Sequence, residues 1–354
     1  MVEHQTLTHP VVTAPEPSTD SIAEVNSIFE QPWWLDAVAP GQWGEATVKR
    51  GDNVVARLPY AHRRRLGLST IGQPPFTQTL GPWLAPMEGK YARRLETEKK
   101  LLGQLIEQLP AFDFYRQSFS PALTNWLPFY WAGFAATVRY TYRIEDLSDL
   151  DQVKSEFQDH VRRGIRKAEK AIEVDHDYPL EDLLRLNEQT YARQGVRSPD
   201  SPDLVRRLDA ACAARGARRI FGAVDSQGRV HAALYIVWDD RTCYALINAR
   251  DPELQTHGSN TLLYWEAIRL ASEVSRVFDF EGSMLEPIEH YFRGFGGRQA
   301  PYFSVSRAGL RAKPVLAAWS TRQALGRLAR ARTGARGRRA IGPAEAGPAT
   351  DPPQ

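Results

Sequence analysis

The order of hydrophobic and polar residues predicts alternating strands and helices from about Gln31 onward. Strict alternation of polar and apolar residues indicates a strand, whereas apolar residues spaced three or four positions apart indicate a helix. The first half of the chain predicts a strand from Trp43, a second strand after a turn at 51–53, a short strand ending near Ile71, a helix over 91–109, and strands over 111–117 and 137–144.

The second half begins with a long predicted helix over about 150–171. On it, Val161, Ile165, Ala168 and Ile172 share one face, and Arg163, Arg166, Lys167 and Lys170 share another. Further on we predict helices over 180–194 and 202–215, a hairpin over 219–238 with its turn at 225–228, a strand over 242–250, a helix over 260–274 and a strand over 277–281. Asp279 and Glu281 alternate on this last strand, so both side chains are expected on the same face of the sheet.

An internal repeat relates the two halves. Three short segments return in the same order and at slowly decreasing spacing: Val54–Tyr60 as Val230–Ile236, Phe112–Phe114 as Phe278–Phe280, and Gly133–Phe134 as Gly294–Phe295. A repeat of this length is too long for a solenoid and indicates a tandem duplication of an α/β unit. We therefore predict an α/β fold with a mixed sheet, built from two similar domains over 26–148 and 149–307 with a cleft between them.

Composition agrees with a globular protein of about two domains. Of the 354 residues, 42% are hydrophobic and 25% are charged. No apolar run approaches the roughly 18 to 20 residues needed to cross a bilayer, and the first 30 residues lack a basic segment followed by an apolar one. We therefore expect a cytoplasmic protein without integral membrane contact, whose oligomeric state the sequence leaves open.

Positive charge is concentrated in the C-terminal segment. Residues 308–354 contain nine Lys and Arg against two acidic residues, a net charge of +7, so the rest of the chain sums to −4 although the whole carries +3. The basic balance is therefore no indication of a nucleic-acid-binding body. Residues 1–25 and 308–354 lack the composition of a packed core and are predicted to be disordered; the basic tail could contact RNA or anionic lipid, or simply be solvated.

Cysteine and histidine usage narrows the chemistry. Cys212 and Cys243 are the only cysteines, which excludes a disulfide framework and a cysteine-built zinc site. His231, His257 and His290 have no spacing typical of a metal site, so no bound metal is expected. No Ser–His–Asp set stands out either. We expect no tightly bound cofactor.

The segment 251–260 joins a predicted strand to a predicted helix. It ends in Gly258, Ser259 and Asn260, which are good N-capping residues, and free backbone N–H groups at the start of a helix form a seat for an anion. The stretch Gln255–Asn260 resembles the Gln/Arg-x-x-Gly-x-Gly/Ala pyrophosphate loop of the GNAT acyltransferases, with Asn260 in place of the small last residue. A plain capped helix is the alternative interpretation.

Three further segments resemble the FemAB-type branch of the GNAT superfamily: Arg162–Ala171, Phe278–Ser283 and Tyr291–Gly297. The resemblance extends from about Gln31 to Arg307, and the two C-terminal motifs are its most specific part. This branch has two tandem GNAT-like domains, which agrees with the internal repeat. It includes enzymes that transfer an aminoacyl group from aminoacyl-tRNA to an amine.

The resemblance implies a donor site in the second domain. The donor would lie against Asn248, Arg250, Gln255, His257, Gly258, Ser259, Asn260 and Thr261. Within Phe292–Arg293, Arg293 matches a family cation that steadies the reacting acyl group. Arginine can clamp an oxyanion or phosphate but cannot serve as a base. A surface arginine that caps the preceding turn is the alternative.

The acidic candidates follow from the chemistry of amide formation. Acyl transfer to an amine needs the nucleophile neutral, so a carboxylate that accepts a proton is useful. Glu281 is the preferred candidate. Asp279 is the second, since the related leucyl/phenylalanyl-tRNA-protein transferases use an acidic residue in a similar Asp-x-Gln pattern. Asp113 occupies the equivalent place in the first repeat, however, which favours a structural role for this aspartate.

The predicted basic helix face suggests a phosphate-bearing substrate. Arg163, Arg166, Lys167 and Lys170 could bind a tRNA acceptor end or a nucleotide-linked acceptor, although charged helix faces are usually only solvated. The sequence thus predicts a transferase that moves an aminoacyl group from aminoacyl-tRNA to an amine of a small molecule, a peptide, or an envelope or secondary-metabolite precursor. An acyl-CoA-dependent N-acetyltransferase is the first alternative, and a non-catalytic module on a degenerate GNAT pair is the second.

Overall fold

The computed structural model describes residues 21–314, apart from 66, 194–200, 252, 255–257 and 283. The disorder expected of residues 1–20 and 315–354 lies outside this range. Within it, Val25 and Ala312, both assigned by composition to the disordered ends, are buried. Among the described helices, none combines the length and apolar character required to cross a membrane.

The first half consists of a short 3₁₀ helix and six strands interleaved with three helices. In chain order these are Ile28–Glu30, α1 (Pro32–Val38), β1 (Trp43–Arg50), β2 (Asn53–Arg65), β3 (Leu68–Gly72), β4 (Trp83–Leu84), α2 (Tyr91–Glu107), β5 (Phe114–Ser118), α3 (Leu127–Trp131) and β6 (Ala135–Ile144). The α2 helix and the strands other than β4 agree with the sequence prediction to within a few residues, whereas β4, α1 and α3 were not predicted.

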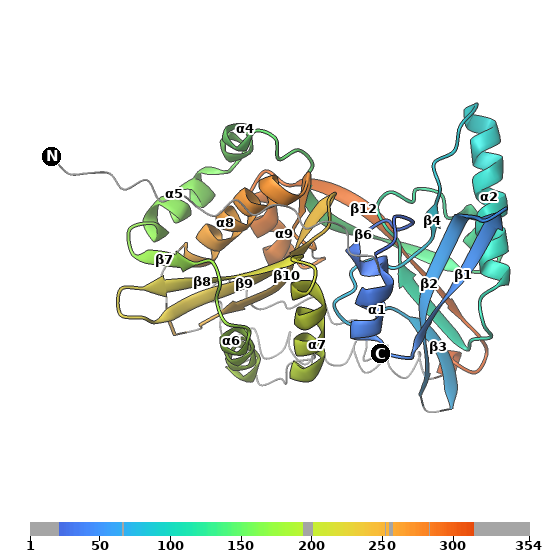
Figure 1. The fold of residues 1–354 in the computed structure, drawn as a ribbon, viewed down its shortest axis with the longest axis horizontal. Helices are drawn as coiled ribbons and strands as arrows, with labels where there is room; N and C mark the ends of the chain where they lie inside the picture. Colours follow the sequence, from blue (N-terminus) through green and yellow to red (C-terminus); the bar gives the residue numbers. More distant parts are fainter. Residues whose placement is uncertain are drawn as a thin grey trace.

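The second half follows with the same kinds of element. In chain order these are α4 (Leu150–Ser155), α5 (Asp159–Ala168), β7 (Ile172–Asp175), α6 (Leu180–Arg193), α7 (Pro202–Ala213), β8 (Arg218–Asp225), β9 (Val230–Trp238), β10 (Thr242–Arg250), α8 (Ser259–Val274), β11 (Val277–Asp279), α9 (Glu286–Arg293) and β12 (Arg298–Ala308). Figure 1 shows α5 and α8 on one side of this part of the sheet, and α6 and α7 on the other.

The strands form one mixed sheet whose order is symmetric about its centre. The order is β1-β2-β3-β5-β12-β6-β11-β10-β9-β8-β7, and β4 pairs with β2 off this path. On each side of the centre, an antiparallel meander (β1-β2-β3 or β8-β9-β10) is followed by a parallel partner, β5 or β11. The repeat inferred from the sequence is therefore visible in the topology, and the mixed α/β fold is confirmed.

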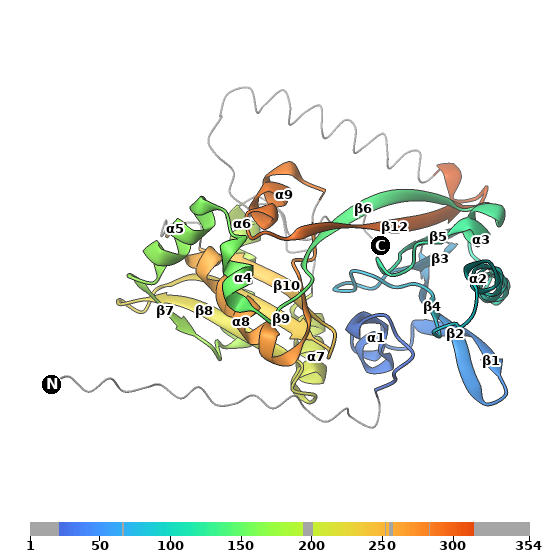
Figure 2. The same ribbon diagram turned by 90° about the horizontal axis from the view of Figure 1, so that it is seen from above.

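The two halves exchange their last strands. β6, which ends the first half, pairs with β11 of the second, while β12, which ends the second, pairs with β5 of the first. β6 and β12 also pair with each other along most of their length, from Arg298–Arg143 to Ser306–Ala135. Figure 2 shows these two long strands side by side between the halves. Each half therefore contributes a strand to the other.

Residues 150–171 form two helices rather than the single predicted one. α4 and α5 are separated by 156–158, where Gln158 is extended, with φ −65° and ψ 155°. The backbone N–H of Gln158 donates to the carbonyl oxygen of Gly294 at 2.8 Å. This hydrogen bond to a distant segment replaces a helical one and fixes the start of α5. Lys170, predicted on the helix, lies beyond its end.

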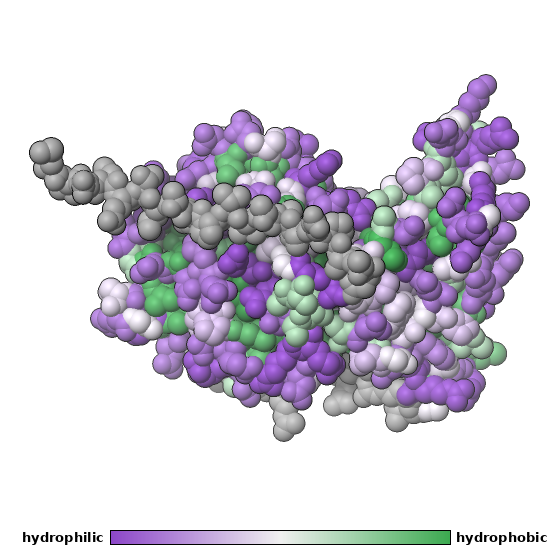
Figure 3. Space-filling model, in the orientation of Figure 1, coloured by the Kyte–Doolittle hydropathy of each residue, from purple (hydrophilic) through white to green (hydrophobic). Residues whose placement is uncertain are grey.

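Three clusters of buried side chains fill the molecule. One lies under α5, α8 and α9, a second under α1, α6 and α7, and a third in the first half. Trp34 of α1 and Leu208 of α7 belong to the same cluster, so the N-terminal helix packs against the second half of the sheet. The face seen in Figure 3 is largely hydrophilic, with hydrophobic residues in patches on both halves.

Candidate functional site

Glu281 lies directly after β11, not within it. The strand ends at Asp279, and Glu281 is left-handed with φ 54°, which is uncommon for a residue with a side chain. The prediction that Glu281 continues the strand, on the same face as Asp279, is therefore wrong. The chain instead turns tightly across β6: a Cβ added at Gly282 would lie 2.3 Å from the Cα of Thr141. Strained conformations of this kind concentrate at functional sites.

The carboxyl group of Glu281 is poorly solvated. Its side chain is partly exposed as a whole, but Oε1 is buried and has no hydrogen-bond partner in the described part of the chain. Burial, and secondly the negative charge of Asp279, raise the pKa of Glu281 well above its ordinary value. A carboxylate with a raised pKa is a stronger base, which suits it to accept a proton from an amine.

Asp279 holds the turn that carries Glu281. Its Oδ1 accepts hydrogen bonds from the Thr141 hydroxyl at 2.5 Å and from the backbone N–H of Glu281 at 2.8 Å. Its Oδ2 forms an ion pair with Nε of Arg143, 3.7 Å away. Burial raises the pKa of Asp279 to about 6, against the opposing effects of Thr141 and Arg143. Asp279 is thus placed to orient Glu281 and to act on its charge.

Arg293 lies on the exposed side of α9. Its Nε donates to Oε1 of Glu289 at 2.9 Å, and its Nη2 is 3.2 Å from Nδ1 of His290. Half of its side chain is exposed. Within the described residues, no hydrogen bond or ion pair joins Arg293 to Glu281. The structure therefore does not bring the two together, and a clamp on an oxyanion would use the Nη groups of Arg293, because its Nε is bonded to Glu289.

The predicted donor loop is described only in part. Gln255 and His257 lie outside the described residues. Gly258 precedes α8 with φ 101°, and a Cβ added there would lie 2.1 Å from the carbonyl oxygen of Gly164 in α5. Only glycine fits such a backbone at such a close approach. The start of α8, where Ser259 is buried, is consequently packed against α5.

A polar network joins the donor candidates to α9. The side chain of Asn248 in β10 donates to Oδ1 of Asn260 at 2.5 Å, and Nδ2 of Asn260 donates to the hydroxyl of Tyr291 at 3.2 Å. The hydroxyl groups of Thr261 and Tyr291 are 3.3 Å apart. Burial raises the pKa of Tyr291 to about 12, and the charge of Arg250 opposes this. Two of the predicted donor residues, Asn260 and Thr261, thus contact Tyr291, and Asn248 joins them through Asn260.

One edge of β10 is free next to this network. β10 pairs with β11 only from Thr242 to Tyr244, although β10 continues to Arg250. Beyond Tyr244, no described strand pairs with β10 on the β11 side. An unpaired strand edge presents backbone N–H and C=O groups that can bind an extended ligand. The edge ends near Asn248, and so leads to the network around Tyr291.

The four predicted cations gather on and after α5. Arg163, Arg166, Lys167 and Lys170 are all exposed and, together with Glu169, line a shallow concavity. The buried residues of α5, such as Ile165, occupy the opposite face, as predicted. Gly164, which lies between Arg163 and Arg166 in the sequence, contacts Gly258 at the start of α8.

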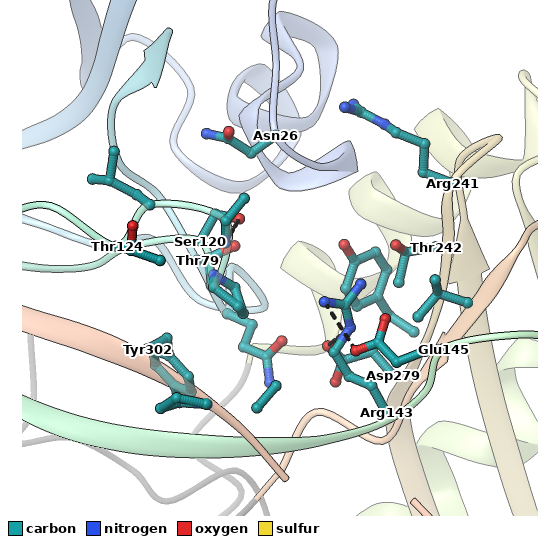
Figure 4. A pocket seen from close by; sticks show the side chains of 18 of the residues that line it. Asn26, Thr79, Ser120, Thr124, Arg143, Glu145, Arg241, Thr242, Asp279 and Tyr302 are labelled. Carbon is teal, nitrogen blue, oxygen red and sulfur yellow. Dashed lines mark hydrogen bonds and ion pairs between the residues drawn. The ribbon is translucent and has the colours of Figure 1, made fainter. Parts of the chain in front are cut away.

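A cavity of about 720 Å³ lies between the two halves. Figure 4 shows Arg143, Glu145 and Asp279 together on one wall, with Thr79, Ser120 and Thr124 across from them. Asp279 is the only one of the predicted catalytic residues among the lining residues, which otherwise come from both halves. Glu281 is connected to this wall through its hydrogen bond to Asp279.

Sequence reasoning missed the contributions of β6 and α9. Thr141 and Arg143 belong to the first half and reach Asp279 only because the last strands are exchanged. No local sequence pattern marks these two residues. A strand register inferred from the internal repeat could have identified them. Tyr291 begins a motif that was recognised, yet its place at the centre of the polar network depends on contacts between three elements, β10, α8 and α9.

Residues 155–293 match the family described as the acetyltransferase (GNAT) domain. The chain carries a GNAT acyltransferase domain. The matched segment includes both carboxylates, the α5 cations and the donor candidates. Acyl transfer is accordingly the activity class of the protein, as the sequence predicted.

Solved structures extend the likeness from this GNAT domain to the whole fold. The chain is similar to FemX, with a TM-score of 0.58 and 12% identity over 78% of this chain and 91% of that one. It is also similar to the C-terminal domain of a putative lysylphosphatidylglycerol synthetase from Agrobacterium fabrum, with a TM-score of 0.51 and 12% identity over 78% and 87%. No curated protein matches this sequence significantly. At such identities the likeness shows a shared, Fem-like GNAT fold.

Proposed function

We propose that the protein transfers an aminoacyl group from aminoacyl-tRNA to the amine of a small molecule or peptide, which belongs to a cell-envelope or secondary-metabolite precursor. The observation that carries this proposal is the position of the basic face of α5. Gly164, which lies between two of its cations in the sequence, contacts Gly258 at the start of α8, and the free edge of β10 leads to the same region. A nucleic-acid end could bind these cations through its phosphates.

The reaction requires a base, and Glu281 fits that role. The amine nitrogen attacks the ester carbonyl of the aminoacyl group, and the bond from this carbonyl carbon to the ribose oxygen breaks. The proton lost by the amine passes to the carboxylate of Glu281, which then gives it to the departing ribose oxygen, so that a hydroxyl forms and the carboxylate is restored. Because burial raises the pKa of Glu281, its carboxylate is a stronger base and accepts this proton readily.

The acceptor would enter from the cavity between the halves. Asp279 lines this cavity and accepts the backbone N–H of Glu281, which puts the base next to the cavity wall. The donor would approach from the α5 and α8 side of the sheet, along β10. In this arrangement the two substrates meet at the end of β11.

A CoA thioester is the second candidate donor. The match to an acetyltransferase family favours it, as does the left-handed glycine before α8. Here the amine would displace a thiolate instead of a ribose oxygen, with the same base. Either donor is a co-substrate, so neither candidate requires a tightly bound cofactor.

The two donors are separable in one pair of assays. We would test thermal stabilisation by acetyl-CoA and free CoA, and transfer of label from mixed charged tRNA with and without RNase. An aminoacyl-tRNA enzyme shows RNase-sensitive transfer and salt-sensitive binding that weakens in Arg166→Ala and Lys167→Ala. Arg94→Ala is the matched control, since Arg94 is an exposed arginine on α2 at the other end of the molecule. Stabilisation by CoA without tRNA-dependent transfer would contradict the proposal and select the thioester.

A further inference from the structure

Arg143 has hydrogen-bonding capacity that the described chain does not use. Its Nε is buried and has no hydrogen-bond partner. Its ion pairs, to Oδ2 of Asp279 and Oε1 of Glu145, are 3.7 Å and 3.6 Å long, which is beyond hydrogen-bond distance. A guanidinium group carries five N–H donors in a planar fork that matches the two oxygens of a carboxylate or phosphate. Nε faces Asp279, but the Nη groups also make no hydrogen bond to a described residue, so they are available for a ligand in the cavity that Arg143 lines.

Two further arginines line the cavity. Arg276, in the turn before β11, is exposed. Arg241 donates from Nη2 to the carbonyl oxygen of Val25 at 2.8 Å, which ties it to the N-terminal segment over the cavity. Against three arginines the cavity lining offers two carboxylates, those of Asp279 and Glu145. The cavity is thus positive on balance and favours an anionic ligand.

The opposite wall is neutral. Its polar lining residues carry hydroxyl or amide groups, and the others are apolar: Asn26, Gln78, Thr79, Ser120 and Thr124, with Pro121, Ala122 and Leu123. Such a wall can accommodate the uncharged part of a ligand, but it has no charged side chain to pair with a second charged group on that ligand. A cavity of about 720 Å³ is within the usual size for a small-molecule site, roughly 300–1,000 Å³.

We propose that this cavity binds an acceptor that carries an anionic oxygen group, a carboxylate or a phosphate, in addition to its amine, and that Arg143 binds the anionic group. Arg276 and Arg241 flank this site, and the body of the acceptor lies along the neutral wall. The amine of this ligand is directed toward the end of β11, where Asp279 connects the cavity to Glu281. The assignment of the ligand as the acceptor rests on the proposed function; the anion site rests on the cavity itself.

The test compares probes that differ only in the anionic group. Binding is measured by calorimetry for alanyl-alanine against alanyl-alanine amide, and for phosphoethanolamine against ethanolamine. We expect the anionic member of at least one pair to bind and its neutral counterpart not to bind, and the pair that responds distinguishes carboxylate from phosphate. Arg143→Gln should weaken this binding roughly tenfold to a hundredfold. Arg94→Gln, the exposed arginine on α2, should leave it unchanged.

Three outcomes would overturn the inference. These are binding of neither anionic probe at millimolar concentration, equal binding within both pairs, and unchanged affinity in folded Arg143→Gln. If Arg143→Gln does not fold, exposed Arg276→Gln gives the answer, because it too should weaken the anionic probe. Anion-dependent binding without acyl transfer from either donor would retain the cavity site and contradict the proposed function. If the protein transfers an acyl group to an acceptor without an anionic group, and Arg276→Gln does not change this transfer, the proposed function is retained and the anion site is contradicted.

Discussion

At the scale of single residues, Glu281 combines features that packing alone does not explain. It has a left-handed backbone, a buried Oε1 without a hydrogen-bond partner among the described residues, and a pKa raised well above its ordinary value. Each of these destabilises the folded chain. Their coincidence at the end of β11, inside the matched GNAT domain, is best explained if the residue is kept for chemistry.

The first prediction concerns stability. Because the folded state raises the pKa of Glu281, its contribution to stability is fully present below the unfolded pKa and is lost as the pH rises through the folded pKa. Glu281→Gln should therefore raise the unfolding temperature at pH 8 relative to the wild type, and less so at pH 4. Exposed Glu188→Gln on α6 is the control and should have no such effect. A destabilised Glu281→Gln protein at pH 8 would show that the carboxylate serves the fold.

A second prediction separates the roles of the two carboxylates. Asn at position 279 can still accept from Thr141 and from the backbone N–H of Glu281, but it lacks the negative charge that raises the pKa of Glu281. Asp279→Asn should therefore shift the rising limb of the pH–rate profile to lower pH while transfer continues. A loss of transfer at every pH in a folded variant would instead make Asp279 the base.

At the scale of elements, the contact between α5 and α8 shapes the candidate donor site. Gly164 and Gly258 let the two helices approach so closely that no side chain fits at position 258. The sequence predicted both glycine-containing segments and the basic face of α5. It could not predict their contact, because the break between α4 and α5 depends on a hydrogen bond to Gly294, far along the chain.

The third prediction tests this contact. At position 258 the backbone has φ 101°, and Gly258→Ala places a methyl group against the backbone of Gly164. The backbone strain alone costs roughly 1–3 kcal/mol, and the clash should make the loss of stability larger than that. Gly228→Ala is the matched control, since Gly228 also has a positive φ, of 75°, but has no atom near its added Cβ. Chemical denaturation measures both. Equal losses of stability would contradict the close contact.

At the scale of the whole molecule, the exchange of β6 and β12 makes one functional unit of two repeats. The internal repeat was readable from short segments such as Phe112–Phe114 and Phe278–Phe280, because the same strands recur on both sides of the sheet. The exchange was not readable, since pairing of last strands across the repeats leaves each local pattern unchanged. It brings Thr141 and Arg143 of the first half to Asp279 of the GNAT domain.

The central claim is that Glu281 is the base for acyl transfer, at a site between the donor side near α5 and α8 and the cavity between the halves. The most direct measurement is the rate of label transfer from charged tRNA to small-molecule acceptors, for wild type and Glu281→Gln, as a function of pH. The account predicts RNase-sensitive transfer by the wild type that rises with pH as Glu281 ionises, and a loss of about 100-fold or more in Glu281→Gln with its fold intact. Equal rates for the two proteins would contradict it.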